Sequence, residues 1–178
     1  MRDWSRDGRY IAFDRGSSHR DEIWILPLFG DKKPFPFLQN PVNDRYAAFS
    51  PDSKWLSYDS DESGRTEVYV APFPQGNGKW QVSTSGGRQS RWRPDGKELY
   101  YLSPDDKLMA VTIQEKSGSL EIGNPQTLFQ ANLAKTTGLV PYDVAVDGKK
   151  FVLLTPPAQS IPEPITLVTN WMTLLKKP

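Results

Sequence analysis

One short pattern recurs four times along this 178-residue chain, and it constrains the fold more than any other feature. Each copy is a large apolar residue, two variable residues, an aspartate and then a glycine or serine. The four aspartates lie 45, 43 and 52 residues apart. A chain with such a period is expected to stack one supersecondary unit several times. The copies are Trp4-Ser5-Arg6-Asp7-Gly8, Phe49-Ser50-Pro51-Asp52-Ser53, Trp92-Arg93-Pro94-Asp95-Gly96 and Val144-Ala145-Val146-Asp147-Gly148.

Short apolar stretches follow each copy, and their number indicates about four strands in each unit. A period of about 40–50 residues with four strands is typical of a β-propeller. We therefore predict an all-β fold with four antiparallel blades, the last lacking its outer strand. Gln114–Asn124 and Asn132–Gly138 are expected to be loops that lengthen the last step. The predicted blades span 1–39, 40–84, 85–132 and 133–171, followed by a tail at 172–178.

The repeated residues have two expected structural roles. An aspartate before a glycine favours a tight hairpin turn, because glycine tolerates positive φ and the carboxylate accepts nearby N–H groups. Ser53 replaces that glycine in the second copy and is expected to weaken its turn. The predicted turn residues are Asp7, Gly8, Asp52, Asp95, Gly96, Asp147 and Gly148; the residues predicted to pack between blades are Trp4, Phe49, Trp92 and Val144.

Composition excludes several kinds of chemistry. The absence of cysteine excludes disulfides, thiol catalysis and cysteine metal sites, and the single histidine excludes a histidine-rich metal site. A net charge of +1 gives no field that would attract nucleic acid or an anionic membrane. We expect no cofactor, no metal, and no membrane contact by this segment.

The repeats resemble the PD40 (WD40-like, TolB-type) propeller repeat over nearly the whole chain. The most specific stretches are similar to the C-terminal propellers of bacterial transmembrane serine/threonine kinases. This resemblance implies an extracytoplasmic or periplasmic sensor or protein-binding module. The kinase motifs themselves are missing here, and four blades are fewer than that family usually has. The stretches are Arg91-Trp92-Arg93-Pro94-Asp95-Gly96-Lys97-Glu98-Leu99-Tyr100-Tyr101-Leu102, Leu108-Met109-Ala110-Val111 and Pro164-Ile165-Thr166-Leu167-Val168-Thr169-Asn170-Trp171.

Four arginines are the candidate ligand-binding residues: Arg45, Arg88, Arg91 and Arg93. Inner strands could place their guanidinium groups around the mouth of a central channel, where they suit carboxylate or phosphate. The alternative is that they pair with the repeat carboxylates between blades.

Two other polar clusters are weaker candidates. His19 lies close to Ser17, Ser18 and Asp21, which are the residue types of a hydrolase triad, but a hydrophilic loop is the favoured interpretation. Asp59, Asp61 and Glu62 offer oxygen ligands to calcium without the spacing of a known loop, so a solvated turn is favoured there.

Three functions therefore remain open. The favoured one is a non-enzymatic binding module for an unidentified protein or small molecule. The second is a hydrolase or lyase that uses carboxylates and arginines at the channel mouth. The third is a structural unit that self-associates through its open edges, as a dimeric ring of eight blades. The abrupt start of the sequence also suggests a fragment of a larger propeller.

Overall fold

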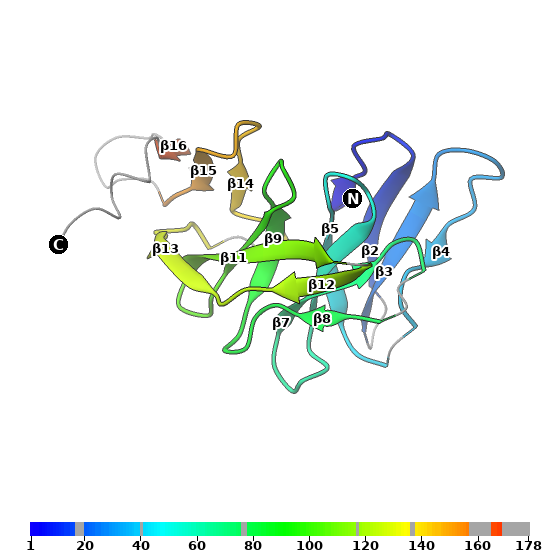
Figure 1. Ribbon diagram of the computed structural model, residues 1–178, viewed down its shortest axis with the longest axis horizontal. Coiled ribbons are helices and arrows are strands. Elements are labelled where there is room, and N and C mark those ends of the chain that lie inside the picture. The colour runs from blue at the N-terminus through cyan, green and yellow to red at the C-terminus, as the bar shows by residue number, and fades with distance from the viewer. Residues whose placement is uncertain are drawn as a thin grey trace.

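The computed structural model is built entirely from β-strands in four antiparallel sheets, which confirms the predicted fold class (Figure 1). It describes residues 1–16, 20–39, 41–75, 78–116, 118–135, 138–156 and the strand at 165–168. Within these ranges no helix has the length and apolar character needed to cross a membrane.

Each sheet is formed by strands that are consecutive in the chain. Sheet 1 has the order β1-β2-β3-β4 and sheet 2 the order β5-β6-β7-β8. In sheet 1 the strands follow one another outward from the middle of the molecule, which we call the hub, to β4 at its edge (Figure 1). The bounds in sheet 1 are β1 Asp3–Trp4, β2 Tyr10–Gly16, β3 Asp21–Pro27 and β4 Phe35–Pro36; those in sheet 2 are β5 Asp44–Phe49, β6 Trp55–Ser60, β7 Glu67–Pro72 and β8 Trp80–Gln81.

Sheets 3 and 4 depart from this plan in opposite ways. In sheet 3 the predicted loop at 114–124 is wrong, because β11 continues to Lys116 and forms a hairpin with an additional strand, β12. Its alternating pattern, with Ile113 and Leu120 buried, is what extends the strand. Sheet 4 has three strands among the described residues. The bounds are β9 Arg88–Trp92, β10 Glu98–Leu102, β11 Lys107–Lys116, β12 Ser119–Ile122 and β13 Gln126–Gln130 in sheet 3, and β14 Tyr142–Val144, β15 Phe151–Leu154 and β16 Ile165–Val168 in sheet 4.

The repeated aspartate closes the turn between the first two strands of each sheet. In the first copy Asp7 Oδ1 accepts the hydroxyl of Ser5 at 2.6 Å and the N–H of Arg9 at 3.0 Å. These hydrogen bonds lower the pKa of the Asp7 carboxyl, with the serine contributing most. The residue after each aspartate has positive φ, from 59° at Ser53 to 75° at Gly96. The spacing did not reveal a fifth turn of this kind, Ser103–Lys107, between β10 and β11.

Replacing Ser53 with glycine is expected to raise the free energy of unfolding by about 0.5–1 kcal/mol, because a left-handed backbone is strained in any residue with a Cβ. Ser53 has a φ of 59°, and within the described part of the chain its buried Oγ has no hydrogen-bond partner. Urea unfolding checks this value. Ser53→Ala, which keeps the Cβ, should show no such gain, and an equal gain would contradict the explanation.

The hydrophobic core lies between successive sheets rather than within one. One cluster joins sheets 1 and 2, a second joins sheets 2 and 3, and a third joins sheets 3 and 4. Phe49 and Trp92, at the same repeat position, are 6% and 8% exposed, whereas Trp4 is 54% exposed. Val144 is partly buried against the third cluster.

Candidate functional site

The four predicted arginines fall into separate places along the hub. Arg45 is the second residue of the inner strand β5 and Arg88 the first of β9, and both line one cavity of about 280 Å³. Arg91, near the end of β9, lines a second cavity of about 350 Å³. Arg93 lies just beyond β9 and lines a smaller hollow with Asp147 and Gly148. The structure therefore brings Arg45 and Arg88 together and separates them from the other two.

Both arginines of the first cavity form ion pairs with aspartates of the chain. Arg45 Nε lies 3.4 Å from Asp21 Oδ2, which links sheet 2 to sheet 1. Arg88 forms an ion pair with Asp106 of its own sheet and donates to the carbonyl of Ser103 at 2.6 Å. These partners differ from the repeat aspartates that sequence reasoning named.

Asp59 is the buried carboxylate of the first cavity. Both of its oxygens accept the N–H of Gln89, at 2.9 and 2.8 Å, and the φ of 57° at Gln89 accompanies this contact. Tyr46 has the same repeat position as Gln89 and a similar φ of 56°, and its N–H lies 3.4 Å from Asp14 Oδ2. Burial raises the pKa of Asp59 to about 8 against the opposing Gln89 hydrogen bond. The expectation of a solvated turn is therefore wrong at Asp59.

We expect the free energy of unfolding to fall as pH rises from about 5 to about 8, with Asp59 as one cause. The folded chain keeps a proton on Asp59 up to about pH 8, whereas an unfolded aspartate loses it near pH 4. The contribution of Asp59 to the free energy of unfolding therefore falls as the pH rises from about 4 to about 8. Asp59→Asn, whose amide oxygen can still accept the Gln89 N–H, should lessen the decline. Urea unfolding at several pH values tests this, and parallel curves for the two proteins would contradict it.

The second cavity, which we call the hub cavity, receives residues from the inner strands of all four sheets. The residue four before each repeat aspartate lies on one of these inner strands: Asp3, Ala48, Arg91 and Asp143 follow one another from sheet 1 to sheet 4. Three of these four residues are charged and line the cavity. The spacing was visible in the sequence, but Asp3 and Asp143 were not recognised as neighbours of Arg91. The full lining is Arg2, Asp3, Trp4, Arg6, Phe49, Pro51, Arg91, Trp92, Pro94, Asp143, Val144 and Val146.

Of the ion pairs that the four predicted arginines make with described residues, the one of Arg91 is the longest. The side chain of Arg91 is 21% exposed, its Nη1 donates to the carbonyl of Ser90 at 3.0 Å, and its Nε lies 4.0 Å from Asp143 Oδ1. Arg93, by contrast, forms ion pairs with both Asp95 and Glu98, at 3.5 and 3.3 Å.

The two carboxylates near Arg91 are already bound to backbone N–H groups. Asp3 Oδ1 accepts the N–H of Trp4 at 2.9 Å, and its Oδ2 accepts the N–H of Phe49 in the next sheet at 2.7 Å. Asp143 Oδ1 accepts the N–H of Val144 at 2.8 Å. Burial raises the pKa of Asp3, although the hydrogen bonds from the Phe49 and Trp4 N–H groups and the charge of Arg91 oppose the rise.

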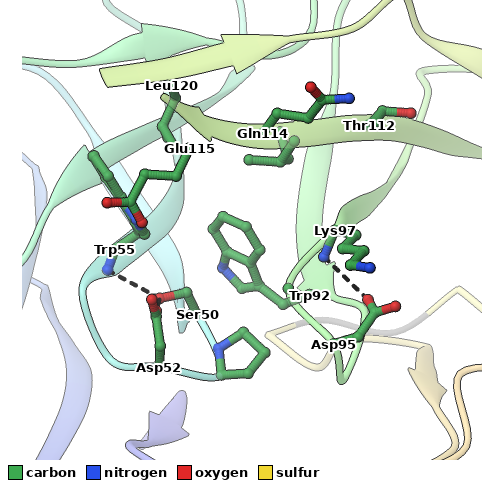
Figure 2. A pocket seen from close by; sticks show the side chains of 13 residues that line it. Ser50, Asp52, Trp55, Trp92, Asp95, Lys97, Thr112, Gln114, Glu115 and Leu120 are labelled. Carbon is green, nitrogen blue, oxygen red and sulfur yellow. Dashed lines mark hydrogen bonds between the residues drawn. The ribbon is translucent and has the colours of Figure 1, made fainter. Parts of the chain in front are cut away.

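A further hollow, of about 570 Å³, lies between the Asp52 and Asp95 turns of sheets 2 and 3. Figure 2 shows the indole of Trp92 between these turns, below the strands that carry Gln114 and Leu120. Asp52 Oδ1 is bound by Ser50 Oγ and Asp95 Oδ1 by the N–H of Lys97. Because these carboxylates close their own turns, we assign the hollow no ligand.

The weaker candidates gain no support. Ser17, Ser18 and His19 lie outside the described residues, while Asp21 begins β3 and pairs with Arg45. Asp61 accepts both the N–H and the Nδ2 amide of Asn43, at 2.9 and 2.6 Å. Among the described residues no group of three or more acidic, histidine or cysteine side chains is arranged to hold a metal ion.

No protein-family model matches the chain, and no curated protein matches it by sequence. Its structure is similar to TolB from Acinetobacter baumannii, with a TM-score of 0.69 and 16% identity over 94% of this chain and 39% of that one. It is also similar to an oligogalacturonate lyase in complex with manganese, with a TM-score of 0.61 and 12% identity over 96% of this chain and 50% of that one. A third similar structure is a putative 6-phosphogluconolactonase from Bacteroides uniformis, with a TM-score of 0.54 and 21% identity over 85% of this chain and 46% of that one.

This chain therefore spans half or less of the length of each of these solved chains. At such identities the likeness shows the fold alone, a β-propeller fold that includes TolB among its neighbours. The similarity to the propellers of receptor kinases stays a prediction.

Proposed function

We propose that this chain is a propeller binding module that holds an anionic ligand, through a carboxylate, in the hub cavity. The observation that carries the proposal is Arg91 on an inner strand, whose side chain is 21% exposed and has one hydrogen bond and one distant ion-pair partner among the described residues. Guanidinium has five N–H donors in a fixed fork that matches a carboxylate. Within the described contacts most of this capacity is available to a ligand.

The surroundings of Arg91 support an anion rather than a cation. The nearby carboxylates of Asp3 and Asp143 bind backbone N–H groups, which reduces their competition for the guanidinium. Arg2 and Arg6 also line the cavity, although Arg2 Nε is paired with Asp14 at 2.7 Å. A volume of about 350 Å³ is in the usual range for a small-molecule site.

A sensor role follows if the resemblance to kinase-linked propellers holds, with ligand occupancy of the hub cavity as the signal. A carboxylated sugar is a reasonable first ligand to test, because the oligogalacturonate lyase by name acts on a polymer of that kind. The same pair of Arg91 and Asp143 favours the second candidate function, a lyase. Its carboxylate would remove the proton next to an arginine-bound acid group while the C–O bond on the neighbouring carbon breaks, so that a C=C bond forms and the sugar oxygen leaves.

Calorimetric titration with citrate and with digalacturonate tests the proposal. We expect binding that weakens about tenfold or more in Arg91→Lys, because lysine lacks the bidentate fork, and more in Arg91→Ala. Arg9→Ala, which removes an equal charge from an exposed position outside the cavity, should bind as the unchanged protein does. Binding by neither probe, or equal binding by Arg91→Ala, would reject the site.

Following unsaturated products by ultraviolet absorbance in the digalacturonate samples separates binding from lyase activity. Product formation that is lost in Asp143→Ala would replace the binding proposal with the enzyme. Measurable binding without any unsaturated product would support the binding proposal.

A further inference from the structure

The repeat gives every sheet two faces with fixed positions. The residue three before the repeat aspartate and its cross-strand partner face the preceding sheet. The residue four before it and its own partner face the following sheet. The pairs facing backward are Trp4/Ile11, Phe49/Leu56, Trp92/Leu99 and Val144/Phe151, and the pairs facing forward are Asp3/Ala12, Ala48/Ser57, Arg91/Tyr100 and Asp143/Val152.

Direct contacts show that the two kinds of face meet at the internal boundaries. Trp92 Nε1 donates to the carbonyl of Ala48 at 3.1 Å across sheets 3 and 2. The rings of Phe151 and Tyr100 pack edge to face at 4.9 Å across sheets 4 and 3. At each internal boundary a backward pair therefore packs on a forward pair.

Among the described residues at these positions, the exposed apolar side chains belong to the two end faces. Ala12, Ser57 and Tyr100 of the forward faces are fully buried, whereas Val152 is 38% exposed. On the backward faces Trp4 is the exposed member, at 54%. Figure 1 places sheet 1, in blue, and sheet 4, in orange, at opposite sides of the molecule.

We infer that a second copy of this chain covers both end faces, with the forward face of sheet 4 on the backward face of sheet 1 of its partner. Val152 of one copy then packs against Trp4 of the other, as Tyr100 packs against Phe151 within the chain. Two such contacts, related by a twofold axis, close one ring of eight sheets.

Asp143 supports this head-to-tail arrangement independently of the apolar residues. It has the repeat position of Asp3, whose Oδ1 binds the next N–H of its own strand and whose Oδ2 crosses to Phe49 of the following sheet. Asp143 makes the first of these bonds, to Val144, and its side chain is 76% exposed. In the proposed dimer the second oxygen of Asp143 would accept the Trp4 N–H of the second copy. That N–H would then be shared between Asp143 and the Asp3 of the second copy.

Light scattering coupled to size-exclusion chromatography tests the inference on the full chain. We expect a mass of two 20.2-kDa chains. Trp4→Glu and Val152→Glu should each raise the dissociation constant at least about 30-fold, the usual effect of losing a buried anchor at an interface. Phe29→Glu, at another exposed aromatic, should leave the mass unchanged.

Mixing the two variants distinguishes the possible arrangements. Each retains the face that the other lacks, so the mixture should form a two-chain species at concentrations where each variant alone is a monomer. The head-to-tail contact would be overturned if the mixed variants formed no two-chain species. It would also be overturned if Trp4→Glu lost the dimer while Val152→Glu kept it. A monomeric unchanged chain would overturn the inference altogether. Circular dichroism of each variant checks that the sheets remain folded.

Discussion

Replacing Trp92 with alanine is expected to lower the free energy of unfolding by about 3–5 kcal/mol, the usual range for a buried tryptophan in a core. Trp92 lies in the cluster between sheets 2 and 3, together with Trp55 and Leu99. The substitution also leaves the carbonyl of Ala48 without its indole donor, at 3.1 Å in the unchanged protein. Figure 2 shows that its ring separates the two turns, so the hollow there should enlarge. Urea unfolding followed by circular dichroism measures the loss.

Trp4→Ala is the matched control, because Trp4 has the same repeat position and the same side chain but is mostly exposed. At concentrations where light scattering shows a monomer, it should cost less than about 1 kcal/mol. Equal losses for the two variants would contradict the assignment of Trp92, and not Trp4, to a covered face.

Phe151→Ala is expected to have a loss of similar size, about 3–5 kcal/mol, with its strongest effect on sheet 4. Phe151 is fully buried and packs on Tyr100 and Phe129 of sheet 3, with ring centroids 4.9 and 5.9 Å apart. Because sheet 4 is held to the rest largely through this cluster, its amides should exchange with solvent faster while those of sheets 1 and 2 change little. Hydrogen exchange followed by mass spectrometry resolves the two regions.

Val152→Ala provides the comparison for Phe151, since the next residue of β15 points to the opposite face and is partly exposed. In the monomer it should cost less than about 1 kcal/mol. Uniform acceleration of exchange over all four sheets in Phe151→Ala would mean that sheet 4 does not open separately.

The sequence was sufficient for the fold class because the same units repeat. The aspartate turn at Asp7, for example, uses a local network of Ser5 and Arg9 that depends on no distant residue. The fifth turn, at Asp105, escaped notice because it closes a different pair of strands and so lies outside the period. The strand β12 was missed because it is only four residues long and lies between Gly118 and Gly123 in a largely polar segment, which has the composition of a loop, although β11 continues its alternation.

The candidate site was predictable only in part. Repeat spacing placed Arg45 and Arg88 at equal positions, and they do line one cavity. It could not tell which carboxylate each arginine meets, because Asp21 and Asp106 come from other strands and turns. The burial of Asp59 was equally hidden, since it depends on the left-handed backbone of Gln89 in the next sheet. The contacts of Arg45 and Asp59 are set by how one sheet packs on another, and that of Arg88 by a turn in its own sheet; a single sequence specifies neither.

The most direct test of the central claim is the side-chain Nε–H resonance of Arg91 in a ¹⁵N-labelled protein titrated with digalacturonate and with citrate. If the hub cavity holds a carboxylate, the Arg91 signal should shift in a saturable way, while that of Arg9, outside the cavity, stays in place. An Arg91 signal that remains fixed with both probes at saturating concentrations would contradict the proposed function.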